Sequence, residues 1–240
     1  TFDEVFKDLC QDVTDYSASE WIWALPFLDG ARGQVLALTG NKMSTNCAGA
    51  LINTISYGSG DKNNAKTQAM IEIVPTFYYE YDKQDLRRDI TILPWTWEYD
   101  DGSGTGSSFT AAVFPGVAST DKKVYQKQSN VSQMYCGKLR VEWMKRKYSS
   151  NEDGIDMPVI RYTDVLLMFA EAAIGSKEGN APTELYGVDP QACFDKVRAR
   201  AGLSSKGLTF DAIVDERAFE FCGENIRKYD LMRWGMLKDK

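Results

Sequence analysis

VIRYTDVLLMFAEAAIG, residues 159–175, is the stretch that decides the fold class of this chain. Its apolar residues return every three or four positions, which is the repeat of one face of an α-helix. Gly175 follows the last of them, and glycine commonly takes the left-handed position that ends a helix. We therefore predict a helix with an inner face of Val165, Leu166, Phe169, Ala172 and Ala173.

Capping residues predict further helices downstream. Asp189 followed by Pro190 is an N-cap with proline at the first helical position, and this helix should continue to Gly202. Thr209 caps a third helix, which ends at Gly223. The expected inner face of the third helix is Phe210, Ile213, Val214, Arg217 and Phe221. A last helix carries Ile226, Leu231, Trp234 and Leu237.

The chain upstream of these helices is less regular. Residues 1–13 predict a helix, and residues 19–27 predict a short strand whose two tryptophans share one face with Leu25. Residues 29–64 are dense in Gly, Ser, Asn and Thr, which predicts long loops.

Two features of the middle of the chain have a further structural meaning. Pro75 should end or kink any helix that runs through it. Residues 90–97 and 109–114 predict a hairpin with a long Gly/Ser tip. The expected fold class is therefore mainly α, with long irregular loops and a few short β-strands or hairpins. We divide the chain into a loop-rich region, 20–157, and a helical region, 158–240.

Composition excludes several classes of function. The formal net charge of −6 and the scattered basic residues do not form the positive surface that nucleic acid requires. The chain has no histidine, so His-based triads, Cys-His dyads and His zinc sites are excluded. Its five cysteines form no C-x-x-C pair, and buried free thiols are expected. We expect no cofactor and no metal site.

The sequence contains neither an apolar run long enough for a membrane span nor a signal-peptide pattern. We therefore expect the piece itself to be soluble. If the protein is exported, we expect its signal and any lipid-bearing cysteine to lie upstream of Thr1.

Three stretches of the helical region carry a resemblance to a known family. MPVIRYTDVLLMFAEAA (157–173), FDKVRARAGL (194–203) and ERAFEFCGENIRKYDLMRWG (216–235) resemble, in order and spacing, the C-terminal signature of SusD/RagB-type nutrient-binding lipoproteins. Weaker similarities lie in SEWIWALPF, in Asp85 with Arg87, and in GKLRVEW.

The resemblance implies that the chain is the C-terminal part of a SusD-like α fold, lacking a tetratricopeptide-like N-terminal half. It further implies a cell-surface protein of the outer membrane, held there by an N-terminal lipid anchor outside this sequence. Family members bind starch, other glycans or peptides, and deliver them to a SusC-like TonB-dependent transporter without cleaving them. The whole chain, 1–240, is then one SusD/RagB-like C-terminal domain.

The signature regions are rich in charged residues, for which two roles are possible. Glu216 and Glu220 stand four residues apart and resemble the paired carboxylates of a glycosidase. Neighbouring arginines should lower the pKa of such carboxylates, however, and join helices through bidentate pairs. We therefore expect a structural ion-pair network and no catalytic residue. Its members are Arg161, Glu171, Arg198, Arg200, Glu216, Arg217, Glu220, Arg227, Asp230 and Arg233.

Ligand binding is expected from aromatic residues of the loop-rich region, because the C–H face of a sugar packs on an aromatic ring. Trp95, Trp97 and Tyr99 alternate along one strand and would form a stacking platform, unless that face is buried core. Tyr57 is a separate candidate. The tyrosines at positions 78, 79 and 81 are expected in the core, and Glu98, Asp100 and Asp101 in a solvated turn instead of a calcium site.

Four functions follow as hypotheses. The first is binding of an oligosaccharide for uptake, and the second is binding of peptides as in the RagB branch. The third is a two-carboxylate glycoside hydrolase, and the fourth is a helical scaffold without ligand. The negative net charge favours a neutral ligand over an acidic one. Glycan binding is our leading hypothesis.

Overall fold

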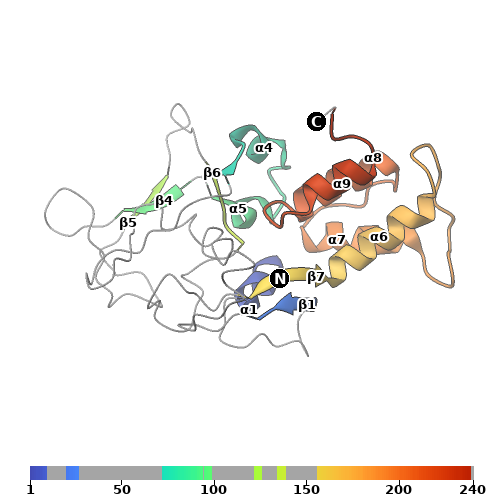
Figure 1. Cartoon of the computed structure of the whole chain (residues 1–240), viewed down its shortest axis with the longest axis horizontal. Helices are drawn as coiled ribbons and strands as arrows, with labels where there is room; N and C mark the ends of the chain where they lie inside the picture. Colours follow the sequence, from blue (N-terminus) through green and yellow to red (C-terminus); the bar gives the residue numbers. More distant parts are fainter. Residues whose placement is uncertain are drawn as a thin grey trace, which may run out of the picture.

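The computed structural model describes residues 1–9, 20–26, 72–93, 95–98, 122–125, 134–138 and 156–238 (Figure 1). The described helices outweigh the strands, and the longest of them gather at one end of the molecule. The predicted fold class, mainly α with a few short strands, is confirmed. Among the described residues no helix is long and apolar enough to cross a membrane.

Four helices make up the C-terminal region. Asp189 caps one of them by accepting hydrogen bonds from the backbone of Gln191 and Ala192, at 2.8 and 3.2 Å. Thr209 caps the next through a 3.1 Å hydrogen bond from the backbone of Ala212. Gly175 has the positive φ, 77°, that ends a helix. These predicted caps are confirmed. The helices are α6 (Tyr162–Ile174), α7 (Pro190–Arg200), α8 (Phe210–Glu220) and α9 (Arg227–Arg233).

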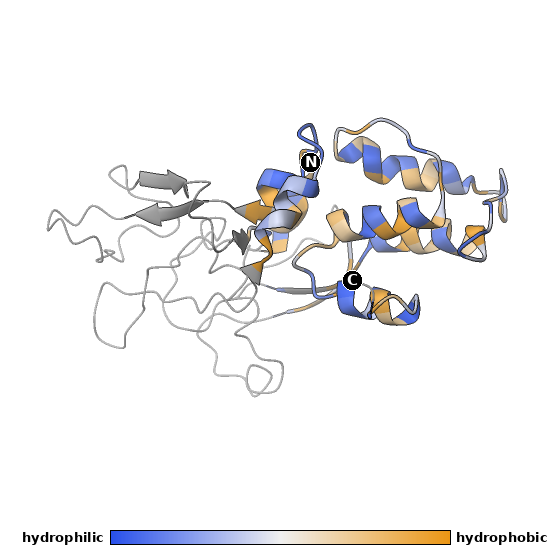
Figure 2. Ribbon diagram, turned by 90° about the horizontal axis from the view of Figure 1, so that it is seen from above, coloured by the Kyte–Doolittle hydropathy of each residue, from blue (hydrophilic) through white to orange (hydrophobic). Residues whose placement is uncertain are grey.

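An apolar core lies between these helices. Leu167, Phe194 and Ile213 are completely buried in it, and orange and blue segments alternate along the helices in Figure 2. The inner face predicted for α8 is confirmed, since all five of its residues are buried. Leu237, predicted as part of the last helix, lies beyond the end of α9 and is exposed.

The inner face predicted for α6 is mostly wrong. Of the five residues expected there, only Leu166 is buried, whereas Val165 and Ala172 are exposed. The buried face also includes Leu167, Ala170 and Ile174. Because α6 carries apolar residues around nearly its whole circumference, their spacing does not identify the side that packs on α7 and α8.

The N-terminal elements pack beside the start of α6. Helix α1 (Phe2–Leu9) buries Phe2, Phe6 and Leu9. Strand β1 (Trp21–Leu25) pairs antiparallel with β7 (Met157–Arg161).

The predicted face of β1 is wrong. Trp21 and Ala24 are buried, whereas Trp23 is 52% exposed. Register irregularities on both sides of Trp23 break the alternation of the strand, as a β-bulge does.

The described residues in the middle of the chain form two small sheets. Strands β2 (Glu72–Ile73) and β3 (Ile92–Leu93) flank β6 (Met134–Cys136), and both pair with it antiparallel. Strand β4 (Trp95–Glu98) pairs with β5 (Lys122–Tyr125). A hairpin partner was predicted at 109–114, which lies outside the described residues; the described partner is β5.

Two short helices, α4 (Pro75–Glu80) and α5 (Arg88–Thr91), connect β2 to β3. Pro75 begins α4 at the first helical position, where its missing N–H costs no hydrogen bond. It therefore starts a helix instead of interrupting one.

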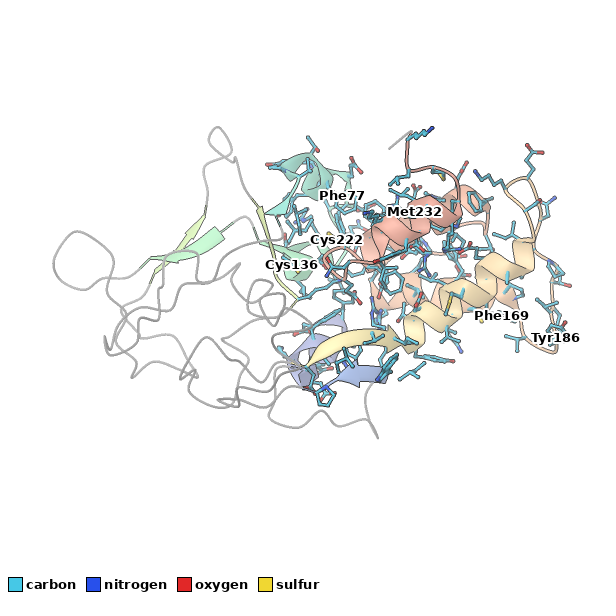
Figure 3. All side chains as sticks on the ribbon, viewed as in Figure 1. Phe77, Cys136, Phe169, Tyr186, Cys222 and Met232 are labelled. Carbon is cyan, nitrogen blue, oxygen red and sulfur yellow. The ribbon has the colours of Figure 1, made fainter. Side chains whose placement is uncertain are left out.

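Three of the cysteines lie within the described residues as free thiols, and Cys10 and Cys47 lie outside them. Cys136 and Cys193 are buried, and Cys222 is half-buried. Cys136 and Cys222 come from β6 and from the end of α8 (Figure 3). Burial raises the pKa of the Cys222 thiol to about 12, so it stays protonated at neutral pH.

Candidate functional site

Ten charged side chains from six separate parts of the chain meet where α8 ends. We call them the Glu220 cluster. Five cations face five anions in it, so its formal charges balance. The cations are Arg87, Lys138, Arg161, Arg198 and Arg200, and the anions are Glu20, Asp85, Glu216, Glu220 and Glu224.

Glu220 is the centre of the cluster, and its side chain is 0% exposed. Its Oε1 accepts a hydrogen bond from Arg161 Nη1 at 2.5 Å, and its Oε2 accepts one from Arg87 Nη1 at 2.9 Å. Arg200 Nη2 also donates to Oε1. Three guanidinium groups, from three segments of the chain, therefore converge on one carboxylate of α8.

Arg161, at the end of β7, connects the N-terminal elements to the turn after α8. Its Nε and Nη2 donate to the two carboxylate oxygens of Glu224, both at 2.9 Å. Its Nη1 also donates to Glu20 Oε1 at 2.6 Å. The guanidinium carbon lies 4.5 Å from the centre of the Phe221 ring. Only a planar, five-donor group can make this set of contacts.

Arg87 connects the α4–α5 segment to α8. Its Nε and Nη2 donate to Asp85 at 2.9 and 2.7 Å, and its Nη1 donates to Glu216 Oε1 at 2.6 Å. The second oxygen of Glu216 accepts from Arg198 Nη1 at 2.9 Å, so α7 belongs to the same network.

Lys138 closes the cluster on the side of α1. Its Nζ donates to the Glu220 carbonyl at 2.5 Å and to Glu224 Oε1 at 2.6 Å. The same ammonium lies 5.0 Å from the centre of the Phe6 ring and 5.4 Å from that of Phe2. Helix α1 thus covers the cations with aromatic rings, which excludes water and contributes cation–π attraction.

The electrostatics of the cluster keep Glu220 and Glu224 ionised. Burial alone would raise the pKa of Glu220, but Arg161, Arg200 and Arg87 outweigh burial and hold it well below its usual range. Glu224 shows the same balance, with Arg161 and Lys138 lowering its pKa. A carboxylate of this kind has no proton to donate at neutral pH, so Glu220 lacks the property that a general acid needs.

A second network links α6, α8 and α9. Arg217 donates to Asp230 Oδ2 at 2.8 Å and to Asp164 Oδ1 at 2.7 Å. Arg233 pairs with Asp230 and with Glu171, and Glu171 also accepts from the indole of Trp234 at 2.8 Å. Of the predicted network residues, Arg227 differs, because its Nη1 donates to the backbone carbonyl of Val214 at 2.9 Å.

Four members of these networks were not predicted from the sequence: Glu20, Lys138, Asp164 and Glu224. Asp85 and Arg87 were noted only as a weak D-x-R similarity, although Arg87 is among the largest completely buried side chains. Glu20 and Arg161 are 141 residues apart, so no local pattern relates them. A charged residue within a predicted strand, as Glu20 is, was the one available signal.

Two of the four predicted stacking residues lie within the described part of the chain. Trp95 and Trp97 lie at alternate positions of β4, and their backbones pair with Tyr125 and Lys123. Tyr57 and Tyr99 lie outside the described residues. Their role in stacking remains a prediction.

The expectation that three tyrosines lie in the core holds only for Tyr81, which is buried and donates to the Phe219 carbonyl at 2.8 Å. Tyr79 is 55% exposed and Tyr78 is half-buried. Within the described ranges no group of three or more Cys, Asp or Glu side chains is arranged to hold a metal ion.

Comparisons with known proteins agree with this helical fold. Residues 12–240 match the sequence model of the SusD family, so the chain belongs to that family. SusD-like protein P25 of Formosa agariphila is 30% identical, over 98% of this chain and 43% of its own length. The resemblance predicted from the three signature stretches is thereby confirmed.

Solved structures with lower identity share the fold. Surface glycan-binding protein A from Bacteroides thetaiotaomicron is 22% identical, with a TM-score of 0.59, over 98% of this chain and 45% of its own. A laminarin-binding SusD-like protein is 21% identical, with a TM-score of 0.55, over 100% of this chain and 46% of its own. The chain therefore spans less than half the length of the relatives it matches.

Proposed function

We propose that this chain is part of a cell-surface glycan-binding protein that binds an oligosaccharide and delivers it to a SusC-like TonB-dependent transporter without cleaving it. The observation that carries the proposal is the match to the SusD family over residues 12–240. Two structural relatives are named for binding glycans, one of them laminarin, which supports a sugar ligand.

The two regions of the chain have different tasks in this proposal. The helical region, 158–240, is the scaffold, since arginines and carboxylates of this region form buried ion pairs with one another, such as Arg161 with Glu220 and Arg217 with Asp230. The loop-rich region, 20–157, contacts the sugar through Trp95, Trp97, Tyr99 and Tyr57. The net charge of −6 favours a neutral glycan over an acidic one.

The proposed location is the extracellular face of the outer membrane, through an N-terminal lipid anchor outside this sequence. A binding protein held there would concentrate its glycan beside the transporter, and tight aromatic stacking would serve capture better than turnover.

Catalysis is not part of the proposal. Glu216 and Glu220, the pair that resembles a glycosidase, are buried and face Arg87, Arg161 and Arg198. A glycosidase needs one carboxyl group that carries a proton near neutral pH, whereas the pKa of Glu220 is lowered.

Affinity electrophoresis of the 240-residue chain in gels containing laminarin, starch or an acidic polysaccharide tests this proposal. We expect retardation in a neutral glycan and no release of reducing ends on prolonged incubation. Reducing ends that accumulate with time would overturn the non-catalytic role. Affinity for a peptide library together with no retardation by any glycan would favour the RagB-like alternative.

Two tryptophan variants test the binding residues. Trp95→Ala and Trp97→Ala should each weaken glycan binding by about tenfold or more, as loss of a stacking ring does. Trp23→Ala is the matched control, because Trp23 is an exposed tryptophan of β1, far from β4 in Figure 1. Equal binding by all three variants would remove the stacking platform from the proposal.

A further inference from the structure

The α4–α5 segment presents the exposed ring of Tyr79, whose position is set by the packing of α4 on α8. Phe77 stacks on Phe219 of α8 with ring centres 5.5 Å apart, and Tyr81 lies 4.7 Å from the same ring. Residues four apart share one face of a helix, so the packing of Phe77 and Tyr81 on Phe219 turns Tyr78 and Tyr79 away from α8. The exposure of Tyr79 and the partial exposure of Tyr78 thus follow from the packing of α4.

Tyr78 is held in one place by polar contacts. Its hydroxyl donates to Asp89 Oδ1 at 2.6 Å, and the guanidinium carbon of Arg88 lies 5.0 Å from its ring centre. Burial and the hydrogen bond to Asp89 raise the pKa of Tyr78 to about 12, so the phenol keeps its proton and remains a donor. Tyr78 is therefore a fixed support.

The ring of Tyr79 packs edge-on against the ring of Tyr78 and is exposed to solvent. The two rings are perpendicular, at 88°, with centres 5.3 Å apart. Tyr79 nevertheless remains 55% exposed. A ring that is already ordered loses little conformational entropy when a ligand packs on it, which makes it a better platform than a free side chain.

A charged pair lies next to the tyrosines. Arg88 donates to both carboxylate oxygens of Asp89, at 3.0 and 2.9 Å. The Asp89 side chain is 61% exposed, so its carboxylate can still accept hydrogen bonds from outside. An aromatic face beside a neutral pair of donors and acceptors fits a sugar, whose C–H face is apolar and whose rim carries hydroxyls.

We infer that Tyr79, Tyr78, Arg88 and Asp89 form a subsite for one unit of a neutral glycan, separate from the tryptophans of β4. The inference rests on the proposed glycan-binding function and adds a place of contact to it. Trp95 lies six positions after Asp89 in the chain, which limits their Cα separation to at most about 21 Å. One extended oligosaccharide can therefore contact both places.

Isothermal titration of the chain with laminarin and with a short glucose oligosaccharide tests the subsite. Tyr79→Ala should weaken binding of laminarin about tenfold, whereas Tyr79→Phe, which keeps the ring, should bind as the wild type does. Asp89→Asn keeps the shape of the side chain and should weaken binding about fivefold, because a charge-assisted acceptor is lost. Tyr186→Ala is the control, since Tyr186 is 94% exposed and lies at the edge of the molecule beyond α6, away from Phe77 (Figure 3).

The outcomes separate this inference from the proposed function. Full laminarin binding by Tyr79→Ala and Asp89→Asn, with loss in Trp95→Ala, would overturn the subsite and leave the proposed function standing. Failure of the wild-type chain to bind any glycan would overturn both. Should Tyr79→Ala melt at a lower temperature than the wild type, Asp89→Asn and the Tyr79→Phe comparison still decide the question.

Discussion

Arg87 and Arg88 are neighbours in the chain, and both pair with aspartate, but one belongs to the buried interior of the molecule and the other to its surface. Arg87 is completely buried in the Glu220 cluster and contacts three carboxylates. Arg88 lies at the surface beside tyrosines, and its partner Asp89 is largely exposed. The same pair of residue types is therefore part of the scaffold in one region and available to a ligand in the other.

Burial is the cause of this difference. Removing a charge from water costs several kcal/mol, which only several well-placed partners can offset. The Glu220 cluster meets this condition at its centre, because Arg161 and Glu220 each have charged partners from several separate parts of the chain. An exposed pair interacts through water and is worth about 0 to 1 kcal/mol. We therefore expect substitutions in the buried cluster to change stability, and those at the surface to change binding.

The largest expected effect is that of Glu220→Ala. It leaves Arg87, Arg161 and Arg200 without their shared partner, and breaking a buried ion pair costs roughly 3 to 5 kcal/mol. Urea unfolding followed by circular dichroism measures the loss. Glu178→Ala, which removes an exposed carboxylate, should change stability by less than about 0.5 kcal/mol. A similar small change for Glu220→Ala would mean that the buried charges contribute no more to stability than the exposed ones.

Acid should destabilise the protein next most strongly. The folded-state pKa values of Glu220 and Glu224 are lowered, so their stabilisation is complete above the unfolded pKa of about 4.3 and is lost as pH falls towards the folded values. We expect the free energy of unfolding to fall by roughly 2 to 3 kcal/mol below pH 4. Glu220→Gln should show a shallower fall over the same pH range. Parallel curves for the two proteins would assign the acid sensitivity to other carboxylates.

Arg161→Lys tests whether positive charge alone holds the Glu220 cluster together, because lysine keeps the charge of arginine and loses its planar geometry. Lysine cannot form the two-pronged contact with Glu224 and reach Glu20 and Glu220 as well. We expect a loss of about 2 kcal/mol, the range of hydrogen bonds to charged groups. Arg88→Lys, at the surface, is the matched control and should be nearly neutral. Equal stability of both variants would show that charge alone, without geometry, holds the cluster.

Asp89→Asn should have the smallest effect on stability. Its pair with Arg88 is exposed, so thermal melting should report a change below about 0.5 kcal/mol. In the isothermal titration with laminarin, the same variant should nevertheless bind more weakly than the wild type. A large drop in melting temperature would place Asp89 in the scaffold and contradict the contrast between the two regions.

Much of the helical region could be predicted from the sequence, because its signals are local. Asp189, Thr209 and Gly175 act on backbone groups within four residues, and each was found at the end it predicted. The inner face of α8 was also predicted, because its residues recur at the three- and four-residue spacing of one helical face, although α8 buries Glu216 and Glu220 as well. The family signature is local in the same sense, being confined to three short stretches.

What the sequence by itself determined was therefore the helices, their ends, the family and the absence of histidine chemistry. Only the tertiary structure decided which charges meet, because Arg161 finds partners 59, 63 and 141 residues away, and no local pattern encodes such distances. It also decided that Trp23 faces solvent, through an irregular register, and that Tyr79 is exposed while Tyr81 is buried. Local signals act on neighbouring backbone atoms, whereas burial depends on everything that packs around a side chain.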